Sequence, residues 1–478
     1  MSQLSGWLLS LAERGRAGAW SAAAEVARHR GCYAPVTRSC VQVIEMSGLA
    51  DQALTRRTFL AAGAAAISFP TFAWATRSAR QSDQTGLRLE LFPPTGRYSI
   101  GTVQLYLVDH SRRDPWLPSR PRELMVSVWY PARDHSGSAF APWIQHRAGV
   151  LYLNQFISSL YQSVGPTPNH GNRVPLSGVE LPITRARLRG PADLSGAPYP
   201  VVLYQPGLGD IRETGTGLVS DLASRGYVVV TMDDTYEAEV VEFPGGRLAT
   251  TLPNQTHVGP ARLADTRFVL DEMSRLRAGV NPDALHRKLP SGLGESLNMT
   301  KVGMFGHSMG GATAARAMAA EQRIHAGVDL DGSLFAKLRS NPNRDIAALA
   351  KRLARQLGRR PFMLMTSQGH DAQSDPSLAG FWEGLRGWRL FLSMRNSQHF
   401  TYMDLEEFLS QMLAAGIAPR YITEQIVTEF IGTVEPSRAV AAERAYITAF
   451  FDLQLRGRHS NLMTGPSPEY PEIEFLRH

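Results

Sequence analysis

Residues 306–310 read Gly-His-Ser-Met-Gly, which fits the G-x-S-x-G pattern with Ser308 at its centre. In this pattern the serine lies on a sharp turn between a strand and a helix, and the flanking glycines let the two elements approach without a Cβ clash. The strand-like stretch 301–305 and the alanine-rich stretch 310–321 provide that strand and that helix. The spacing therefore predicts that Ser308 is a nucleophile that attacks an ester carbonyl.

A serine hydroxyl needs an adjacent base that is itself oriented by a carboxylate, and in α/β-hydrolases the chain order is Ser, Asp or Glu, His. His399 lies in the polar loop 396–400, directly after the predicted strand 389–394. This places it at the carboxyl edge of the sheet, where sites of such folds lie. His370 follows the preceding strand and is the competing candidate, whereas His325 precedes a strand. We predict His399 as the base.

The acid has several candidates. Asp331 follows the predicted strand 326–330, and Asp371 and Asp375 follow the next strand, where many α/β-hydrolases carry their acid. Asp329 alternates with Asp331, so its side chain is expected to point to the other face of the sheet, toward helices. For each of them a role in a turn or a helix cap is the alternative. The residues alone leave this choice open.

An oxyanion hole requires two backbone N–H groups aimed at the developing negative charge. Met309, the residue after the nucleophile, is predicted to supply one of them. The loop 205–210 reads Gln-Pro-Gly-Leu-Gly-Asp and follows the predicted strand 199–204. We predict that Leu208 in this loop supplies the second N–H.

The elements that must position these residues alternate between strands and helices. Apolar stretches predict strands at 199–204, 227–232, 302–305, 326–330, 362–365 and 389–394. Between and after them, helices are predicted at 213–225, 260–276, 310–321, 346–357, 402–415 and 437–455. This alternation predicts an α/β-hydrolase fold with a mostly parallel, doubly wound sheet and helices on both faces.

The stretches 87–92, 101–109 and 123–130 predict an antiparallel N-terminal part of this sheet. Residues 131–195 are rich in Pro, Gly, Asn and aromatic residues, and we expect an irregular, cap-like insertion with one helix at about 151–163. No linker interrupts 86–478, which we assign to a single catalytic domain.

The N-terminal region carries a predicted export signal. Residues 55–60 read Thr-Arg-Arg-Thr-Phe-Leu, an apolar run follows at 61–69, and residues 73–75 read Ala-Trp-Ala. This pattern is typical of a twin-arginine signal peptide, which we place at 46–75. We therefore expect a secreted protein that begins at about Thr76. Residues 1–45 are interpreted as a gene-model extension or a disordered segment.

Composition excludes several classes of function. The net charge of +7 is not gathered into a basic patch with interleaved aromatic residues, so nucleic acid is not an expected partner. Both cysteines, Cys32 and Cys40, lie in the first 45 residues, so no Cys nucleophile is available downstream. No His-x-x-x-His or clustered His and carboxylate pattern occurs, and a metal-dependent hydrolase is not expected.

Several segments together resemble a known family. They are Pro-Thr-Gly at 94–96, Gly-Thr at 101–102, Glu-Leu-Met-Val-Ser-Val-Trp-Tyr-Pro at 123–131, Pro-Gly-Leu-Gly at 206–209, Gly-His-Ser-Met-Gly-Gly at 306–311, Leu-Asp-Gly-Ser-Leu-Phe at 330–335 and Ser-Gln-His-Phe at 397–400. Across most of 90–455 the chain resembles the bacterial relatives of plasma-type platelet-activating factor acetylhydrolase. The segment 306–311 around Ser308 is also similar to the corresponding segment of secreted polyester hydrolases and cutinases. It carries Met309 where the plasma enzyme has a bulkier aromatic residue.

The resemblance implies that Asp331, rather than Asp371, is the acid. It implies matching roles for Ser308, His399, Leu208 and Met309. It further implies hydrolysis of short or oxidised acyl esters without a metal or cofactor. The expected substrate is a small-molecule or lipid ester, and transient contact with a lipid surface is a further expectation.

The predicted function is thus a secreted serine esterase or lipase-type hydrolase. The alternatives are a polyester or triglyceride hydrolase and a secreted binding protein that keeps the fold without the chemistry. Four aromatic residues near the catalytic loops are candidates either for an acyl pocket or for core packing: Phe335, Trp382, Phe400 and Tyr402.

Overall fold

The computed structural model describes residues 86–134, 137–164, 176, 178–335 and 345–477. These residues belong to one compact unit built on an 11-stranded sheet of order β15-β14-β13-β12-β11-β7-β8-β3-β2-β6-β4. The predicted signal at 46–75 and the stretch 1–45 lie outside the described residues. The predicted α/β-hydrolase fold class is confirmed.

Six neighbouring strands form the parallel centre of the sheet. They are β8 (Val228–Met232), β7 (Tyr199–Gln205), β11 (Leu297–His307), β12 (Ile324–Leu330), β13 (Phe362–Ser367) and β14 (Arg389–Met394). Their near-continuous apolar character follows from burial on both faces, as parallel strands require. Because they run in one direction, the loops after β7, β11, β12, β13 and β14 all leave at the same edge of the sheet.

Antiparallel strands flank this centre on both sides. On one side β3 (Pro121–Ala132) pairs with β8 and with β2 (Ser99–Arg113). On the other side β15 (Ile473–Arg477) pairs antiparallel with β14. The strand β15 was not predicted from the sequence. Two short ladders complete the strands: β1 (Leu87–Arg88) with β5 (Val179–Glu180), and β9 (Val240–Phe243) with β10 (Arg247–Thr250).

The described part of the segment 131–195 contains more regular structure than expected. It supplies β6 (Ile183–Leu188), which pairs in parallel with β2, and β4 (Phe140–Pro142), which pairs with β6. The expectation of an irregular insertion is therefore wrong for these two strands. The predicted helix is present as α2 (His146–Val164).

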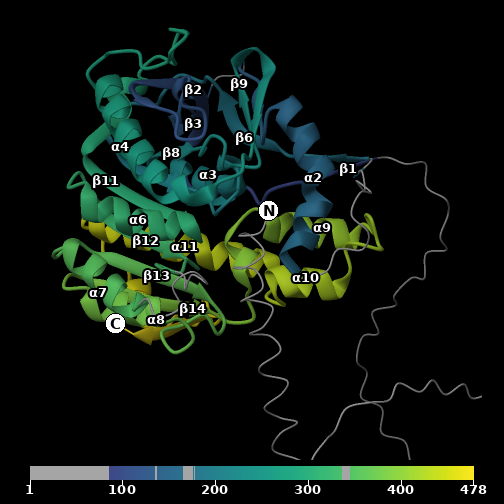
Figure 1. Ribbon diagram of the computed structural model, residues 1–478, viewed down its shortest axis with the longest axis vertical. Coiled ribbons are helices and arrows are strands. Elements are labelled where there is room, and N and C mark those ends of the chain that lie inside the picture. Colours follow the sequence, from purple (N-terminus) through teal and green to yellow (C-terminus); the bar gives the residue numbers. More distant parts are fainter. Residues whose placement is uncertain (1–85, 135–136, 165–175, 177, 336–344, 478) are drawn as a thin grey trace, which may run out of the picture. The chain divides into compact units, whose positions relative to one another are not determined.

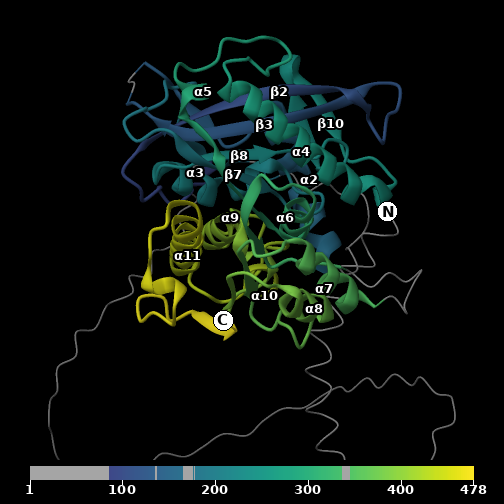
Figure 2. The same ribbon diagram turned by 90° about the vertical axis from the view of Figure 1, so that its left-hand side faces the viewer.

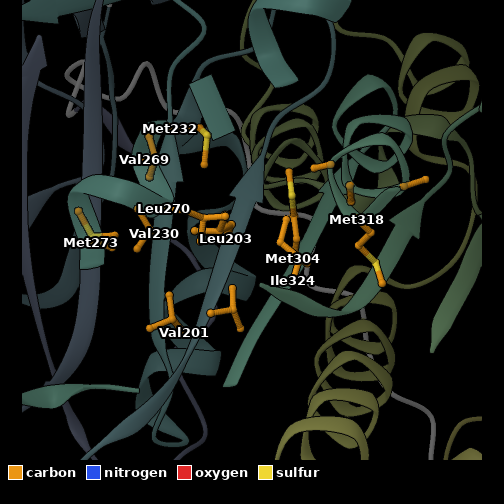
Figure 3. Packing of buried hydrophobic residues seen from close by; sticks show 14 of the residues in the cluster. Val201, Leu203, Val230, Met232, Val269, Leu270, Met273, Met304, Met318 and Ile324 are labelled. Atoms are coloured by element: carbon orange, nitrogen blue, oxygen red, sulfur yellow. The ribbon is translucent and has the colours of Figure 1, made fainter. Parts of the chain in front are cut away.

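Helices cover both faces of the sheet (Figure 2). One face packs against α4 (Val258–Arg277), α5 (Leu293–Ser296), α6 (Met309–Ala320), α7 (Ile346–Gln356) and α8 (Pro376–Gly384). The other face packs against α3 (Thr216–Ser224) and α11 (Pro436–Arg456). Figure 3 shows the first core, in which Val201, Leu203 and Val230 of the sheet meet Leu270 and Met273 of α4.

A third apolar cluster lies beside the sheet. There α2 packs with α9 (Leu405–Ala414) and α10 (Glu424–Ile431), and these helices lie side by side in Figure 1. Short 3-10 turns join the elements: η1 (Arg212–Gly215), η2 (Pro244–Gly246), η3 (Gln255–His257), η4 (His399–Tyr402) and η5 (Asn461–Met463). Among the helices that the structure describes, none is both long and apolar enough to cross a lipid bilayer.

Candidate active site

Ser308 lies on a sharp turn between β11 and α6. Its φ of 55° is in the left-handed region, where a non-glycine residue is strained by about 1–3 kcal/mol. The turn around Ser308 lies very close to β7. A Cβ on Gly310 would stand 2.0 Å from the carbonyl oxygen of Gln205, and a Cβ on Gly306 would stand 2.5 Å from the same atom. Glycine is thus required at both motif positions by contact with the neighbouring strand.

The three predicted side chains meet at the carboxyl edge of the sheet. The Oγ of Ser308 lies 3.1 Å from Nε2 of His399, and Nδ1 of His399 lies 2.6 Å from Oδ2 of Asp331. Since a carboxylate only accepts hydrogen bonds, Nδ1 carries the proton and Nε2 is left to accept from the serine hydroxyl. This is the geometry that deprotonates a serine during attack.

Asp331 also has a strained backbone, with a φ of 56° directly after β12. Its N–H donates to the carbonyl of Met365 at 2.9 Å, and its Oδ1 accepts from both N and Oγ of Ser367 at 2.7 and 2.9 Å. Burial alone would raise its pKa, but hydrogen bonds and ion pairs with His370 and His399 hold the pKa well below the ordinary value. Asp331 is therefore a fixed anion.

His399 is held by contacts to its backbone as well as its ring. Nε2 of His307 donates to the carbonyl oxygen of His399 at 2.8 Å, and the two rings lie 4.6 Å apart. Burial, together with the charges of His307 and His370, lowers the pKa of His399 below its ordinary value, against the opposing effect of Asp331. The free-base form, which a general base needs, is thereby favoured.

The loop before His399 is fixed to its surroundings. Gln398 and Thr401 form a reciprocal capping box across η4, and the hydroxyl of Thr401 donates to the carbonyl of Ile431 at the end of α10. The hydroxyl of Ser397 donates to the carbonyl of Met394 at 2.7 Å. These bonds set the position of the imidazole through the backbone.

The other candidate acids have different partners. Asp371 caps its own turn, accepting from the N–H groups of Gln373 and Ser374. Asp375 accepts from Ser377 N–H at the start of α8. Asp329 lies against α6 as expected, because a Cβ on Gly311 would stand 1.8 Å from its Oδ1.

The two predicted oxyanion donors follow β7 and β11, two neighbouring strands of the sheet. Met309 is the first residue of α6, where the N–H groups have no acceptor within the helix. Leu208 lies in the loop after β7, where the N–H of Gly209 donates to Glu237 and that of Asp210 to the carbonyl of Gly207. No hydrogen bond of the Leu208 N–H occurs within the described residues. Both N–H groups are thus placed at the edge that carries Ser308.

A buried arginine holds the Leu208 loop. Arg262 of α4 is fully buried and donates to the carbonyl oxygens of Pro206 and Gly207 at 2.7 and 2.8 Å. Its Nε donates to Oε2 of Glu237 at 2.9 Å, so the guanidinium charge is paired. Each of these carbonyls shares a planar peptide group with the N–H of the next residue. The bonds to Arg262 therefore fix the directions of the Gly207 and Leu208 N–H groups.

The aromatic candidates divide between the core and the site. Trp382 is buried in the core, and so is Tyr402, whose hydroxyl donates to the carbonyl of Thr366. Phe335 is partly buried beneath Arg316. Phe400 packs 5.2 Å from the His399 ring and is the one of the four placed against the predicted base.

Two residues of the site were not identified from the sequence: Arg262 and His307. Arg262 falls in a predicted helix, where arginine is ordinarily exposed. The sequence does contain a sign that Arg262 is buried. Its spacing places it and Asp265 on the same stripe of the helix as the apolar Val269 and Met273. His307 is a variable position of the motif, and its role depends on a loop about ninety residues away.

No group of three His, Cys, Asp or Glu side chains in the described ranges is arranged to hold a metal ion. The arrangement of Ser308, His399 and Asp331 is the one that acyl transfer through a serine requires.

The chain is similar to known ester hydrolases. Residues 283–343, which include Ser308 and Asp331, match the family described as platelet-activating factor acetylhydrolase, isoform II. A probable 1-alkyl-2-acetylglycerophosphocholine esterase of Arthroderma benhamiae is 25% identical over 409 residues, covering 80% of this chain and 92% of that protein. The platelet-activating factor acetylhydrolase of Bos taurus is 24% identical over 50% of this chain, which spans 54% of that enzyme.

Among solved structures, a ferulic acid esterase from Streptomyces cinnamoneus superposes with a TM-score of 0.62 at 32% sequence identity. The match covers 81% of this chain and 99% of that one.

The role of Arg262 is testable with Arg262→Lys. Lysine keeps the charge but cannot make the forked contacts to two carbonyls and a carboxylate, so ester hydrolysis should fall about 10²-fold in kcat, as when an oxyanion donor is lost. Arg267→Lys, on an exposed position of the same helix, is the matched control. Steady-state kinetics and thermal unfolding are measured together. A folded Arg262→Lys protein with wild-type kcat contradicts the role.

Proposed function

Because the chain belongs to the platelet-activating factor acetylhydrolase family of α/β-hydrolases and is an ester hydrolase, we propose that it cleaves short-acyl esters through Ser308, His399 and Asp331. The observation that carries the proposal is the continuous contact from Ser308 Oγ to His399 Nε2 and from His399 Nδ1 to Asp331. The substrate is a small-molecule ester. If the substrate is a phospholipid, we also propose that the protein makes transient contact with a lipid surface.

In the first half of the proposed reaction, Ser308 Oγ forms a bond to the acyl carbon while His399 Nε2 takes the hydroxyl proton. The carbonyl electron pair moves to the oxygen, where the N–H groups of Leu208 and Met309 stabilise the negative charge. When the tetrahedral intermediate collapses, the ester C–O bond breaks and the leaving alcohol takes the proton from His399. Asp331 keeps the imidazole oriented and stabilises the imidazolium.

In the second half, water attacks the acyl-enzyme and His399 accepts its proton. The Ser308–acyl bond then breaks, the serine regains a proton, and the acid is released. No co-reactant other than water is required.

Two ester classes are favoured by specific relatives. The Arthroderma benhamiae relative, of which the chain covers 92%, favours an acetyl ester of a glycerophospholipid. The ferulic acid esterase structure favours a hydroxycinnamoyl ester as the second candidate. Both share the ester carbonyl that Ser308 attacks and differ in the acyl group.

We test the triad in protein beginning at Thr76, with p-nitrophenyl esters of increasing chain length, methyl ferulate and an acetyl glycerophospholipid. Ser308→Ala should lower kcat by about 10⁶-fold. Asp331→Asn should lower it by about 10⁴-fold because it favours the wrong imidazole tautomer. Asp371→Asn, which alters only a turn, is the control and should keep wild-type activity. Wild-type hydrolysis by folded Ser308→Ala contradicts the proposal, and the substrate profile separates the two ester classes.

We also propose that the protein is exported by the twin-arginine pathway, on the evidence of residues 46–75 alone. In a bacterium with this pathway, the double variant Arg56→Lys, Arg57→Lys should stay in the cytoplasm as unprocessed precursor. Arg77→Lys with Arg80→Lys, beyond the expected cleavage site, is the matched control. Cell fractionation and N-terminal sequencing provide the readout. Export of the first double variant at the wild-type level contradicts the proposal.

A further inference from the structure

The carboxylate of Asp331 lies between two imidazoles. Its Oδ2 accepts a hydrogen bond from Nδ1 of His399 at 2.6 Å, and its Oδ1 lies 2.8 Å from Nδ1 of His370. The second histidine has no place in the chemistry described above, since Ser308 is reached by His399. His370 follows β13 and its side chain is 17% exposed, so this contact is largely shielded from water.

The other nitrogen of His370 also faces a carboxylate. Its Nε2 lies 3.3 Å from Oδ2 of Asp375, and the hydroxyl of Ser333 is 3.5 Å away. A carboxylate accepts hydrogen bonds and does not donate them, so each nitrogen of His370 needs a proton to satisfy its partner. Neutral histidine carries one such proton. The geometry therefore calls for the imidazolium.

We propose that His370 is a positioning residue that stays doubly protonated, holds Asp331 from the side opposite His399, and offsets its negative charge so that His399 remains a free base at mildly acidic pH. The inference rests on the proposed function in one respect, the role of His399 as the base. His370 touches neither Ser308 nor the reacting atoms.

The electrostatic environment agrees with this geometry. Burial lowers the pKa of His370, but contacts with Asp331 and Asp375 outweigh it and raise the pKa to about 10. The positive charge of His370 in turn contributes to lowering the pKa of His399. Among the described residues, the ionisable groups that interact with the two rings or with Asp331 include Asp329, Asp375, His307 and Tyr402, and Asp210 faces His307.

The sign of the expected effect follows from the charges. His399 must be unprotonated at Nε2 to act as base, so activity is lost as the pH falls through its pKa. With the His370 charge removed, the full negative charge of Asp331 acts on His399 and raises that pKa. The acidic limb of the pH–rate profile then moves to higher pH.

Two conservative variants isolate the charge. His370→Asn retains an N–H donor near the position of Nδ1, and Asp375→Asn retains the oxygen that caps α8 while removing the charge that pairs with His370. Neither variant changes a residue of the proposed triad. His325→Asn, an exposed histidine at the opposite edge of the sheet, is the matched control.

We measure kcat/KM for a neutral ester and the rate of inactivation by a fluorophosphonate as functions of pH. His370→Asn should move the midpoint of the acidic limb upward by about one pH unit. In Asp375→Asn, His370 stays protonated over the acidic limb and one negative charge is lost, so the midpoint should not rise. The wild type and His325→Asn should share one midpoint, below the ordinary histidine value of about 6.5. An unchanged midpoint in folded His370→Asn overturns the proposal.

A second measurement does not depend on activity or on folding of His370→Asn. In ¹⁵N-histidine-labelled wild type, NMR should show one imidazole that keeps both protons up to about pH 9, and Asp375→Asn should shift its titration to lower pH. A His370 that titrates near its ordinary pKa overturns the proposal. If Ser308 does not react while this titration is seen, the proposed function fails and the charge state of His370 stands.

Discussion

Two neighbouring strands of the sheet, β11 and β12, end in left-handed backbone at non-glycine residues, and the site depends on this pair. Ser308 and Asp331 have φ values of 55° and 56°. The N–H of Ser308 donates to the carbonyl of Leu330, and that of Asp331 to Met365, so each strained residue is tied to the adjacent strand. Strain of about 1–3 kcal/mol per residue persists only where the surroundings over-determine the conformation. Here the parallel register and the close approach of Gly310 to β7 do so.

Buried charges then fix what the backbone has placed. Arg262 sets the loop of Leu208 through two carbonyl oxygens, and Asp331 sets the tautomer of His399. Each of these charges is paired within the protein, because an isolated charge would be costly to bury. The first arrangement holds the loop of an expected oxyanion donor, and the second holds the proposed base. A hydrolase of this kind therefore has preorganised polar groups on both sides of the attacked carbonyl, where electrostatic stabilisation is most effective.

The parallel centre of the sheet was predictable because its strands are apolar and alternate with helices. The strands β6 and β15 were not, since Ile183–Leu188 and Ile473–Arg477 are short, carry arginine, and form through pairing with distant strands. Ser308, His399 and the candidate acids could be identified because they follow predicted strands. The choice of Asp331 over Asp371 required the family resemblance. The contacts of His370 and Arg262 join segments far apart in sequence, and no local pattern of residue types specifies them.

The most direct measurement is the site of covalent labelling. Protein beginning at Thr76 is treated with a fluorophosphonate, digested, and analysed by mass spectrometry. We expect one adduct per chain, on the peptide that contains Ser308, formed at a rate that falls as the pH is lowered. An adduct on another serine, such as Ser333 beside His370, or no adduct on a folded protein, would contradict Ser308 as the nucleophile.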